Sequence, residues 1–238
     1  MKENFDKVEP RGIPKEIEKK VEKNNTTEMI FVLDESGSMS GLEKDTIGGF
    51  NSMIAKQKKL EGKAYVTTFF FSSRMGIVYD RVPINKVLPL SEEDYCPSGS
   101  TALIDAIGGA ITHVEMMHRY IKDEDIPQHT VFVITTDGFE NASHKYTLSQ
   151  VKEKIKHFKE TRGWEFLFIG ANIDAIGTAS DMGISADRAV NYDVRLGSYE
   201  MYEEVGKTLR DVRACGKISK NWSKNIEKTY EKNKNKEK

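Results

Sequence analysis

Three continuous runs of apolar and threonine residues stand out along the chain, and each ends at an aspartate or a glycine. They cover residues 29–33, 131–136 and 166–169. A strand that is buried on both faces of a parallel sheet has this unbroken pattern, whereas a half-buried strand alternates apolar and polar residues. The runs therefore predict three central strands of a parallel sheet.

A fourth strand is predicted at residues 65–71, which are rich in valine, threonine and phenylalanine. The polar segment 72–74 after it is short enough for a hairpin turn into residues 76–79. A last short strand is predicted at residues 189–192. The hairpin partner would run antiparallel at one edge of the sheet.

Amphipathic stretches separate these strands. Apolar side chains at helical spacing predict five helices. The first ends near Leu60, and the next three cover residues 102–121, 147–162 and 174–182. The last has Tyr202, Val205, Leu209 and Val212 on one face. Helices that alternate with buried strands define the α/β class. We therefore expect a Rossmann-like, mainly parallel central sheet with helices on both faces and one antiparallel edge hairpin strand.

The composition narrows the class further. The chain has 238 residues, of which 38% are hydrophobic and only two are cysteines, so it can bury a core without disulfides or a cysteine-rich zinc site. The first ten residues contain no apolar stretch, and no run of about 18 apolar residues occurs anywhere, so we expect no membrane span and a cytoplasmic location.

The charge is distributed unevenly, although the net charge is −1. Residues 217–238 carry eight lysines and three glutamates, and the rest of the chain carries 28 basic and 34 acidic residues. A body that clamps nucleic acid is usually basic, so we do not expect nucleic acid as its partner. The pattern divides the chain into a charged extension at 1–27, a body at 28–215 and a lysine-rich tail at 216–238.

Both ends of the chain carry apolar residues four apart. Ile13, Ile17 and Val21 predict a short helix in the extension, and the tail repeats the pattern with Ile218, Trp222, Ile226 and Tyr230. The tail has two interpretations. It is a terminal helix packed on the body, or it is a basic arm that docks on an acidic partner, nucleic acid or a membrane surface.

Polar residues follow two of the buried strands directly. Asp34 follows the first run and precedes Ser36 and Ser38, while Asp137 follows the second run. Thr101 lies in a polar loop just before a predicted helix. In an open α/β sheet, ligands bind outside the carboxyl ends of the strands, where these residues would gather.

All five side chains offer hard oxygen atoms. Such ligands suit Mg²⁺ or Mn²⁺ rather than zinc or copper. Three of them are neutral hydroxyls, so a bound ion would keep much of its positive charge and could accept a carboxylate from a partner. Single serines and aspartates in these places are often only helix caps or strand ends.

The motif Asp34-x-Ser36-x-Ser38, followed by Thr101 and by Asp137 in Thr-Thr-Asp-Gly, resembles the metal-ion-dependent adhesion site (MIDAS) of von Willebrand factor type A (VWA) domains. The resemblance covers residues 28–215, and residues 168–175 look like the intracellular bacterial and phage members of that family.

The resemblance implies that Ser36, Ser38 and Thr101 contact the metal and that Asp34 and Asp137 hold it directly or through water. It also implies a non-enzymatic module without catalytic residues, which binds an acidic residue of a protein partner through Mg²⁺ or Mn²⁺.

Two other functions compete with this one. A phosphotransferase of the haloacid dehalogenase type also places an aspartate at the end of a buried strand, but it needs a second aspartate where this chain has Ser36. Binding of nucleic acid or an acidic partner through the tail is the other competing function.

Near the predicted site, we expect Asp105 to favour the helix dipole or orient its neighbours, and Glu140 to be a solvated loop residue.

Overall fold

The computed structural model describes residues 25–193 and 198–234 of the chain. The strands are β1 (Thr27–Asp34), β2 (Ala64–Phe71), β3 (Met75–Pro83), β4 (His129–Thr136), β5 (Glu165–Gly170) and β6 (Ala189–Asn191). The helices are α1 (Glu43–Gln57), α2 (Leu103–Tyr120), α3 (Leu148–Arg162), α4 (Ala175–Asp181), α5 (Ser198–Cys215) and α6 (Lys224–Lys234). Short 3-10 turns are η2 (Gly37–Met39), η3 (Ile84–Lys86), η4 (Asp123–Asp125) and η5 (Ala186–Arg188).

The strands form one six-stranded sheet in the order β3-β2-β1-β4-β5-β6. Only β3 runs antiparallel, and it pairs with β2 through the predicted hairpin. In this order β1 is central, between β2 and β4, which is why its residues are buried on both faces. The predicted fold class is confirmed.

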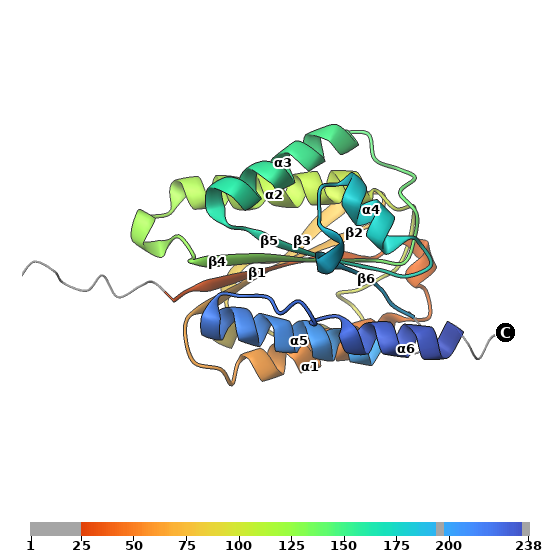
Figure 1. Cartoon of the computed structure of the whole chain (residues 1–238), viewed down its shortest axis with the longest axis horizontal. Helices are drawn as coiled ribbons and strands as arrows, with labels where there is room; N and C mark the ends of the chain where they lie inside the picture. Colours follow the sequence, from red (N-terminus) through yellow and green to blue (C-terminus); the bar gives the residue numbers. More distant parts are fainter. Residues whose placement is uncertain (1–24, 194–197, 235–238) are drawn as a thin grey trace, which may run out of the picture.

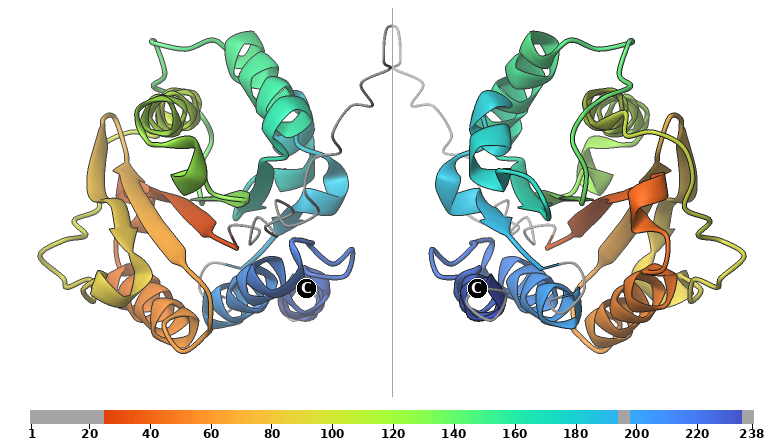
Figure 2. Two further views of the ribbon diagram at one scale, coloured as in Figure 1. Left: turned by 90° about the vertical axis from the view of Figure 1, so that its left-hand side faces the viewer. Right: turned by 90° about the vertical axis from the view of Figure 1, so that its right-hand side faces the viewer.

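Helices cover both faces of the sheet (Figures 1 and 2). One layer contains α2, α3 and α4, and the other contains α1, α5 and α6. Side chains of β1 alternate between them: Met29, Phe31 and Leu33 join the core under α1 and α5, while Ile30 and Val32 join the core under α2 and α3. This period of two is what a strand imposes, so one strand supplies both cores.

The tail packs on the body. Ile218, Trp222 and Ile226 are buried in the core under α1 and α5, and the indole N–H of Trp222 donates a hydrogen bond of 2.8 Å to the Asp187 carbonyl. Of the two interpretations of the tail, packing on the body describes Ile218, Trp222 and Ile226, but only α6, from Lys224 to Lys234, is helical, and residues 218–223 form an irregular segment and a turn. The domain division at residue 216 stays a prediction, and the helix predicted at residues 13–21 lies outside the described residues.

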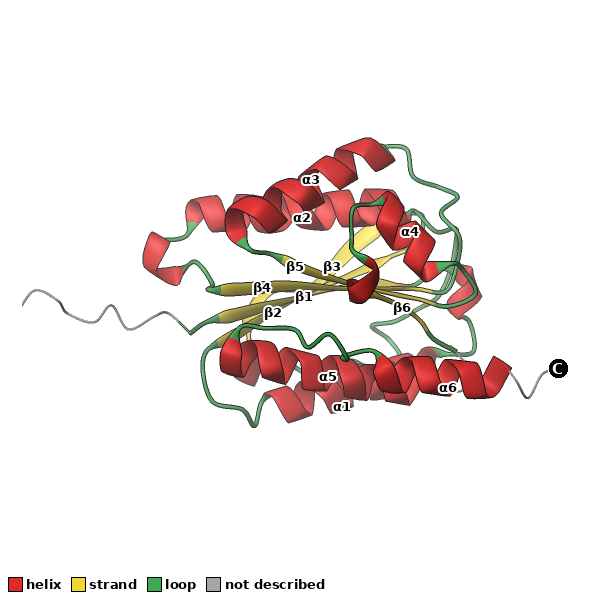
Figure 3. Ribbon diagram, in the orientation of Figure 1, coloured by secondary structure: helices red, strands yellow, loops and turns green. Residues whose placement is uncertain are grey.

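The parallel order places the important loops together. Leu33 on β1 pairs with Thr135 on β4, so Asp34 and Thr136 are neighbours where both strands end. Loops that leave the carboxyl ends of the parallel strands gather at one edge of the sheet, at the right of Figure 3. Within the described part of the chain, none of the helices has the length and apolar content needed to cross a bilayer.

Candidate metal centre

Asp34 ends β1 and is held from three directions. Its side chain is buried, and its two carboxylate oxygens accept hydrogen bonds from the Ser36 N–H at 2.7 Å and from the Thr136 hydroxyl at 2.6 Å. The Tyr95 hydroxyl donates to its backbone carbonyl. The carboxylate therefore has a defined orientation at the edge of the sheet.

The two serines connect Asp34 to the next strand. The hydroxyl oxygens of Ser36 and Ser38 lie 3.0 Å apart, and the Ser38 hydroxyl donates a hydrogen bond of 2.5 Å to the Asp137 carboxylate. Ser36 is buried and Ser38 is exposed. The turn at η2 thus brings oxygens from the loops after β1 and β4 into one continuous chain.

Thr101 reaches the same place from the loop before α2. Gly138 lies against it: a Cβ atom added to Gly138 would be 3.2 Å from the Thr101 hydroxyl and 3.5 Å from the Ser38 hydroxyl. The Gly37 N–H also donates a hydrogen bond of 3.0 Å to the Gly99 carbonyl, which joins the η2 turn to the loop that carries Thr101. All five predicted residues therefore lie at one edge of the sheet, and their role as metal ligands stays a prediction.

The charge at this edge is not balanced by the protein. Neither Asp34 nor Asp137 has an ion-pair partner among the residues that the structure describes. Burial raises the pKa of Asp137, the hydrogen bond from Ser38 lowers it, and the negative charge of Asp34 raises it again. Buried charges are usually paired or bind metal ions, so this edge fits a cation.

The donor set also decides which cation fits. Residues 25–193 and 198–234 contain no group of three or more histidine, cysteine, aspartate or glutamate side chains that could hold a metal. The edge instead combines two carboxylates with three hydroxyls, an all-oxygen set. Hard cations such as Mg²⁺ and Mn²⁺ prefer such oxygen ligands.

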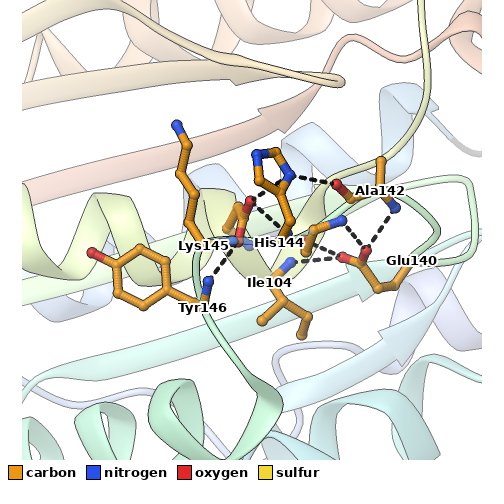
Figure 4. Close-up of polar contacts among 8 residues, drawn as sticks. Ile104, Glu140, Ala142, His144, Lys145 and Tyr146 are labelled. Carbon is orange, nitrogen blue, oxygen red and sulfur yellow. Dashed lines mark hydrogen bonds and ion pairs between the residues drawn. The ribbon is translucent and has the colours of Figure 1, made fainter.

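The loop after Asp137 is fixed to the start of α2 by Glu140 (Figure 4). One carboxylate oxygen of Glu140 accepts the Ile104 N–H at 2.8 Å, and the other accepts the N–H groups of Ala142 at 2.9 Å and Ser143 at 2.7 Å. Glu140 is exposed in the loop, as expected, but its carboxylate also supplies partners for these backbone donors, a role that the expectation did not include.

Asp105 makes the reciprocal connection, from α2 to the loop. Its carboxylate accepts the N–H groups of His144 at 3.0 Å and of Lys145 and Tyr146 at 2.8 Å each. Burial raises the pKa of Asp105, but these backbone hydrogen bonds and the nearby His144 outweigh it, so the pKa is lowered. Asp105 therefore orients its neighbours, which is one of the two roles expected for it.

Between these two carboxylates, Asn141 holds Thr101 directly. The Asn141 side-chain oxygen accepts the Thr101 N–H at 2.9 Å, and the Asn141 N–H donates to the Thr101 carbonyl at 3.1 Å. Glu140 and Asp105 fix the loop that carries Asn141, so they position Thr101 without touching the other four residues of the site.

Sequence reasoning missed three supporting residues: Thr136, Tyr95 and Asn141. Thr136 had a signal, because it is the last residue of a buried run and directly precedes Asp137, so it lies at the predicted strand end. Tyr95 and Asn141 had none, since each acts on a residue that lies 61 or 40 positions away in the chain.

Solved structures of VWA domains have a similar fold. The vWF domain of the type V pili tip protein Mfa5 from Porphyromonas gingivalis matches with a TM-score of 0.57 at 9% identity, over 82% of this chain and 98% of that chain. Proximal thread matrix protein 1 from the mussel byssus, with a zinc-occupied MIDAS motif, has a TM-score of 0.54 at 15% identity, over 78% of this chain and 46% of that chain. A von Willebrand factor type A structure from Catenulispora acidiphila has a TM-score of 0.50 at 14% identity, over 77% and 42%.

No protein-family model and no curated protein matches the sequence. The chain spans less than half the length of the mussel and Catenulispora chains. At these identities the likeness concerns the fold alone: the chain has the Rossmann-like α/β fold that VWA domains also have.

Proposed function

We propose that the chain is a metal-dependent protein-binding module. In this proposal Asp34, Ser36, Ser38, Thr101 and Asp137 hold one Mg²⁺ or Mn²⁺ ion, which in turn binds a carboxylate of a protein partner. The observation that carries the proposal is the pair of buried carboxylates that share an edge with three hydroxyls and have no cation partner among the described residues.

The role of the metal follows from the charges of its ligands. Three neutral hydroxyls and two carboxylates leave a divalent ion electrophilic enough to attract an external carboxylate. The zinc-occupied MIDAS motif of the mussel protein supports divalent metal binding on this fold. The all-oxygen donor set supports Mg²⁺ or Mn²⁺ as the ion for this chain.

The proposal includes no catalytic residue. A phosphotransferase of the haloacid dehalogenase type would need an acid or base at position 36. This chain has Ser36 there, and its hydroxyl is hydrogen-bonded to the Ser38 hydroxyl. The proposal keeps two predictions from the sequence: a cytoplasmic location, and a likeness to the bacterial and phage members of the VWA family.

Titration calorimetry with Mg²⁺ and Mn²⁺ tests the metal site. The wild type should bind one ion per chain, and Asp34→Ala and Asp137→Ala should abolish binding. Asp123→Ala is the matched control, because Asp123 is an exposed carboxylate in η4, which precedes β4, whereas Asp137 follows the opposite end of that strand. Absence of binding by the wild type, or equal loss in the control, would contradict the proposal.

An enzyme assay tests the rival function. Purified protein is incubated with an aryl phosphate and Mg²⁺, and phosphate release is measured for the wild type and Asp34→Ala. We expect no turnover above the Asp34→Ala background. Turnover that depends on both Mg²⁺ and Asp34 would replace the binding module by a phosphotransferase.

A further inference from the structure

Phe139 is exposed beside the candidate metal centre. It follows Asp137 by two positions, and 69% of its surface is accessible to solvent. Burying an aromatic side chain of this size contributes about 1.5–3 kcal/mol, which this position leaves unused in the isolated chain. An exposed phenylalanine next to a proposed binding site is therefore a candidate contact residue.

The segments on both sides of Phe139 are fixed. Before it, the Gly138 backbone lies against the hydroxyls of Thr101 and Ser38. After it, Glu140 is tied to the Ile104 N–H and to the loop beyond (Figure 4). Phe139 is thus presented on a loop whose backbone is held at both ends, so ordering this loop on binding would cost little entropy.

Two more exposed apolar residues lie at the same edge of the sheet. Ile176 is in the first turn of α4, which follows β5, and Tyr199 is in the first turn of α5, which follows β6. Both helices begin at the edge where the parallel strands end (Figure 1). The apolar side of the site is therefore the side of β4, β5 and β6.

The opposite side of the site is charged. A cleft of about 680 Å³ is lined there by Glu43, Lys44, Asp45 and Glu92, together with Tyr95 and Cys96. Tyr95 contacts the Asp34 carbonyl, which places this cleft beside the loop after β1. An apolar group of a partner would consequently be accommodated beside Phe139 and not in the cleft.

We propose that Phe139 is the apolar contact for the partner, and that the partner carries a large apolar side chain close to its metal-binding carboxylate. This inference rests on the proposed function. Contacts of an aromatic residue at the centre of an interface exclude water, and exclusion of water strengthens the electrostatic attraction between a carboxylate and a cation. The two contacts would therefore support each other.

A peptide selection tests the inference with a defined probe. A displayed library with one fixed aspartate and randomised neighbours is selected on immobilised protein with Mg²⁺ and is eluted with chelator. The proteins compared are the wild type, Phe139→Ser, Asp137→Ala and Tyr120→Ser. Tyr120 is the matched control, because it is 81% exposed but ends α2, away from the loops that carry the site.

The wild type and Tyr120→Ser should enrich large apolar residues near the aspartate. Phe139→Ser should lose this enrichment, and the best wild-type peptide should bind it on the order of tenfold more weakly, while the Mg²⁺ affinity measured without peptide stays within about twofold. Asp137→Ala should retain no peptide. If the wild type selects aspartate without apolar neighbours, or Phe139→Ser keeps them, the inference about Phe139 fails and the proposed function stands.

Two other outcomes are separate from these. Selection that ignores both Mg²⁺ and the aspartate would overturn the proposed function itself. Sedimentation of the free protein tests whether Phe139 instead contacts a second copy of this chain. A dimer that dissociates in Phe139→Ser but not in Tyr120→Ser would show this and would overturn the inference.

Discussion

Glu28 and Asp34 lie near opposite ends of β1, and both carboxylates are buried. Glu28 has partners within the protein: its carboxylate lies 2.8 Å from a ring nitrogen of His118 and 3.6 Å from the Arg81 guanidinium. Asp34 receives a hydroxyl and a backbone N–H instead, and it has no ion-pair partner among the described residues. The carboxylate at one end of the strand has cationic partners within the fold, although its second oxygen accepts no hydrogen bond, whereas the carboxylate at the other end has none among the described residues.

The difference between the two ends separates structural from functional charge. A buried carboxylate that is paired inside the fold needs no ion from solution, so it does not make the stability of the folded state depend on a bound metal. A buried carboxylate without a cation makes the stability depend on what binds there. Both kinds of carboxylate are attached to the same strand, so the fold provides a control for the proposed metal centre.

The largest expected effect is at the Glu28 end. Arg81→Met leaves Glu28 with only His118, and breaking a buried ion pair typically destabilises a protein by about 3–5 kcal/mol. Adding Glu28→Gln should recover part of the loss, because it removes the unbalanced charge. Denaturant unfolding of both variants measures this, and no recovery in the double variant would mean that the ion pair is unimportant.

The second effect concerns the metal at the other end. Mg²⁺ at about 100 times its dissociation constant should raise the free energy of unfolding of the wild type and of Arg81→Met alike, by about 2.7 kcal/mol. Asp137→Asn should gain nothing, since it lacks a charged ligand. An equal gain in Asp137→Asn would place the metal elsewhere.

Without metal, Asp137→Asn should be at least as stable as the wild type. Asparagine can still accept the hydrogen bond from Ser38, and the substitution removes a buried charge beside Asp34. The same unfolding measurement in the presence of chelator checks this. Lower stability of the variant would show that the Asp34–Asp137 pair does not need a cation.

A smaller effect is expected for the loop that positions Thr101. Glu140→Gln keeps the size of the side chain but removes the charge that attracts four donors, the three N–H groups described above and the Ser143 hydroxyl. The loop with Asn141 should then hold Thr101 less firmly. Changes in the groups that orient metal ligands typically weaken metal binding about tenfold or more. Calorimetric titration with Mg²⁺ measures the affinity, and an unchanged affinity would limit Glu140 to a structural role.

The smallest effect is the dependence on pH at Asp105. Its folded-state pKa is lowered, so its hydrogen bonds stabilise the protein fully above the ordinary aspartate pKa of about 3.9 and lose their effect as the pH falls through the lowered value. Asp105→Asn should therefore be less stable than the wild type by about 1 kcal/mol at pH near 7. The difference should shrink in acid, and a difference that stays constant with pH would contradict this account.

Local pattern was sufficient for much of the fold and for the five candidate ligands. Apolar runs that end in Asp34 and Asp137 identify buried strands and their ends, because both signals lie within a few consecutive residues. Once parallel strands are inferred, their carboxyl ends must share one edge. The hydroxyls of Ser36, Ser38 and Thr101 follow at short range from those strands and from the start of α2.

Long-range contacts were not predictable in this way. The sequence contains Glu28, Arg81 and His118, but nothing near any of them says that they meet, because their contact depends on how β3 and α2 pack around β1. The same holds for Glu140 and Asn141, which are exposed loop residues whose hydrogen bonds to Ile104 and Thr101 depend on the start of α2 lying beside them.

The tail shows both what local spacing predicts and what only long-range packing decides. Spacing of four between Ile218, Trp222 and Ile226 predicts a helical apolar stripe, because periodicity is a local property of the chain, but α6 begins only at Lys224 and the residues just before it form a turn. Its docking site depends on the surface that α5 and the segment around Asp187 leave open in the folded body. Periodicity and strand ends are written in neighbouring residues, whereas partners across the fold are chosen by packing, and this is why the candidate ligands could be named from the chain while the residues that hold them in place could not.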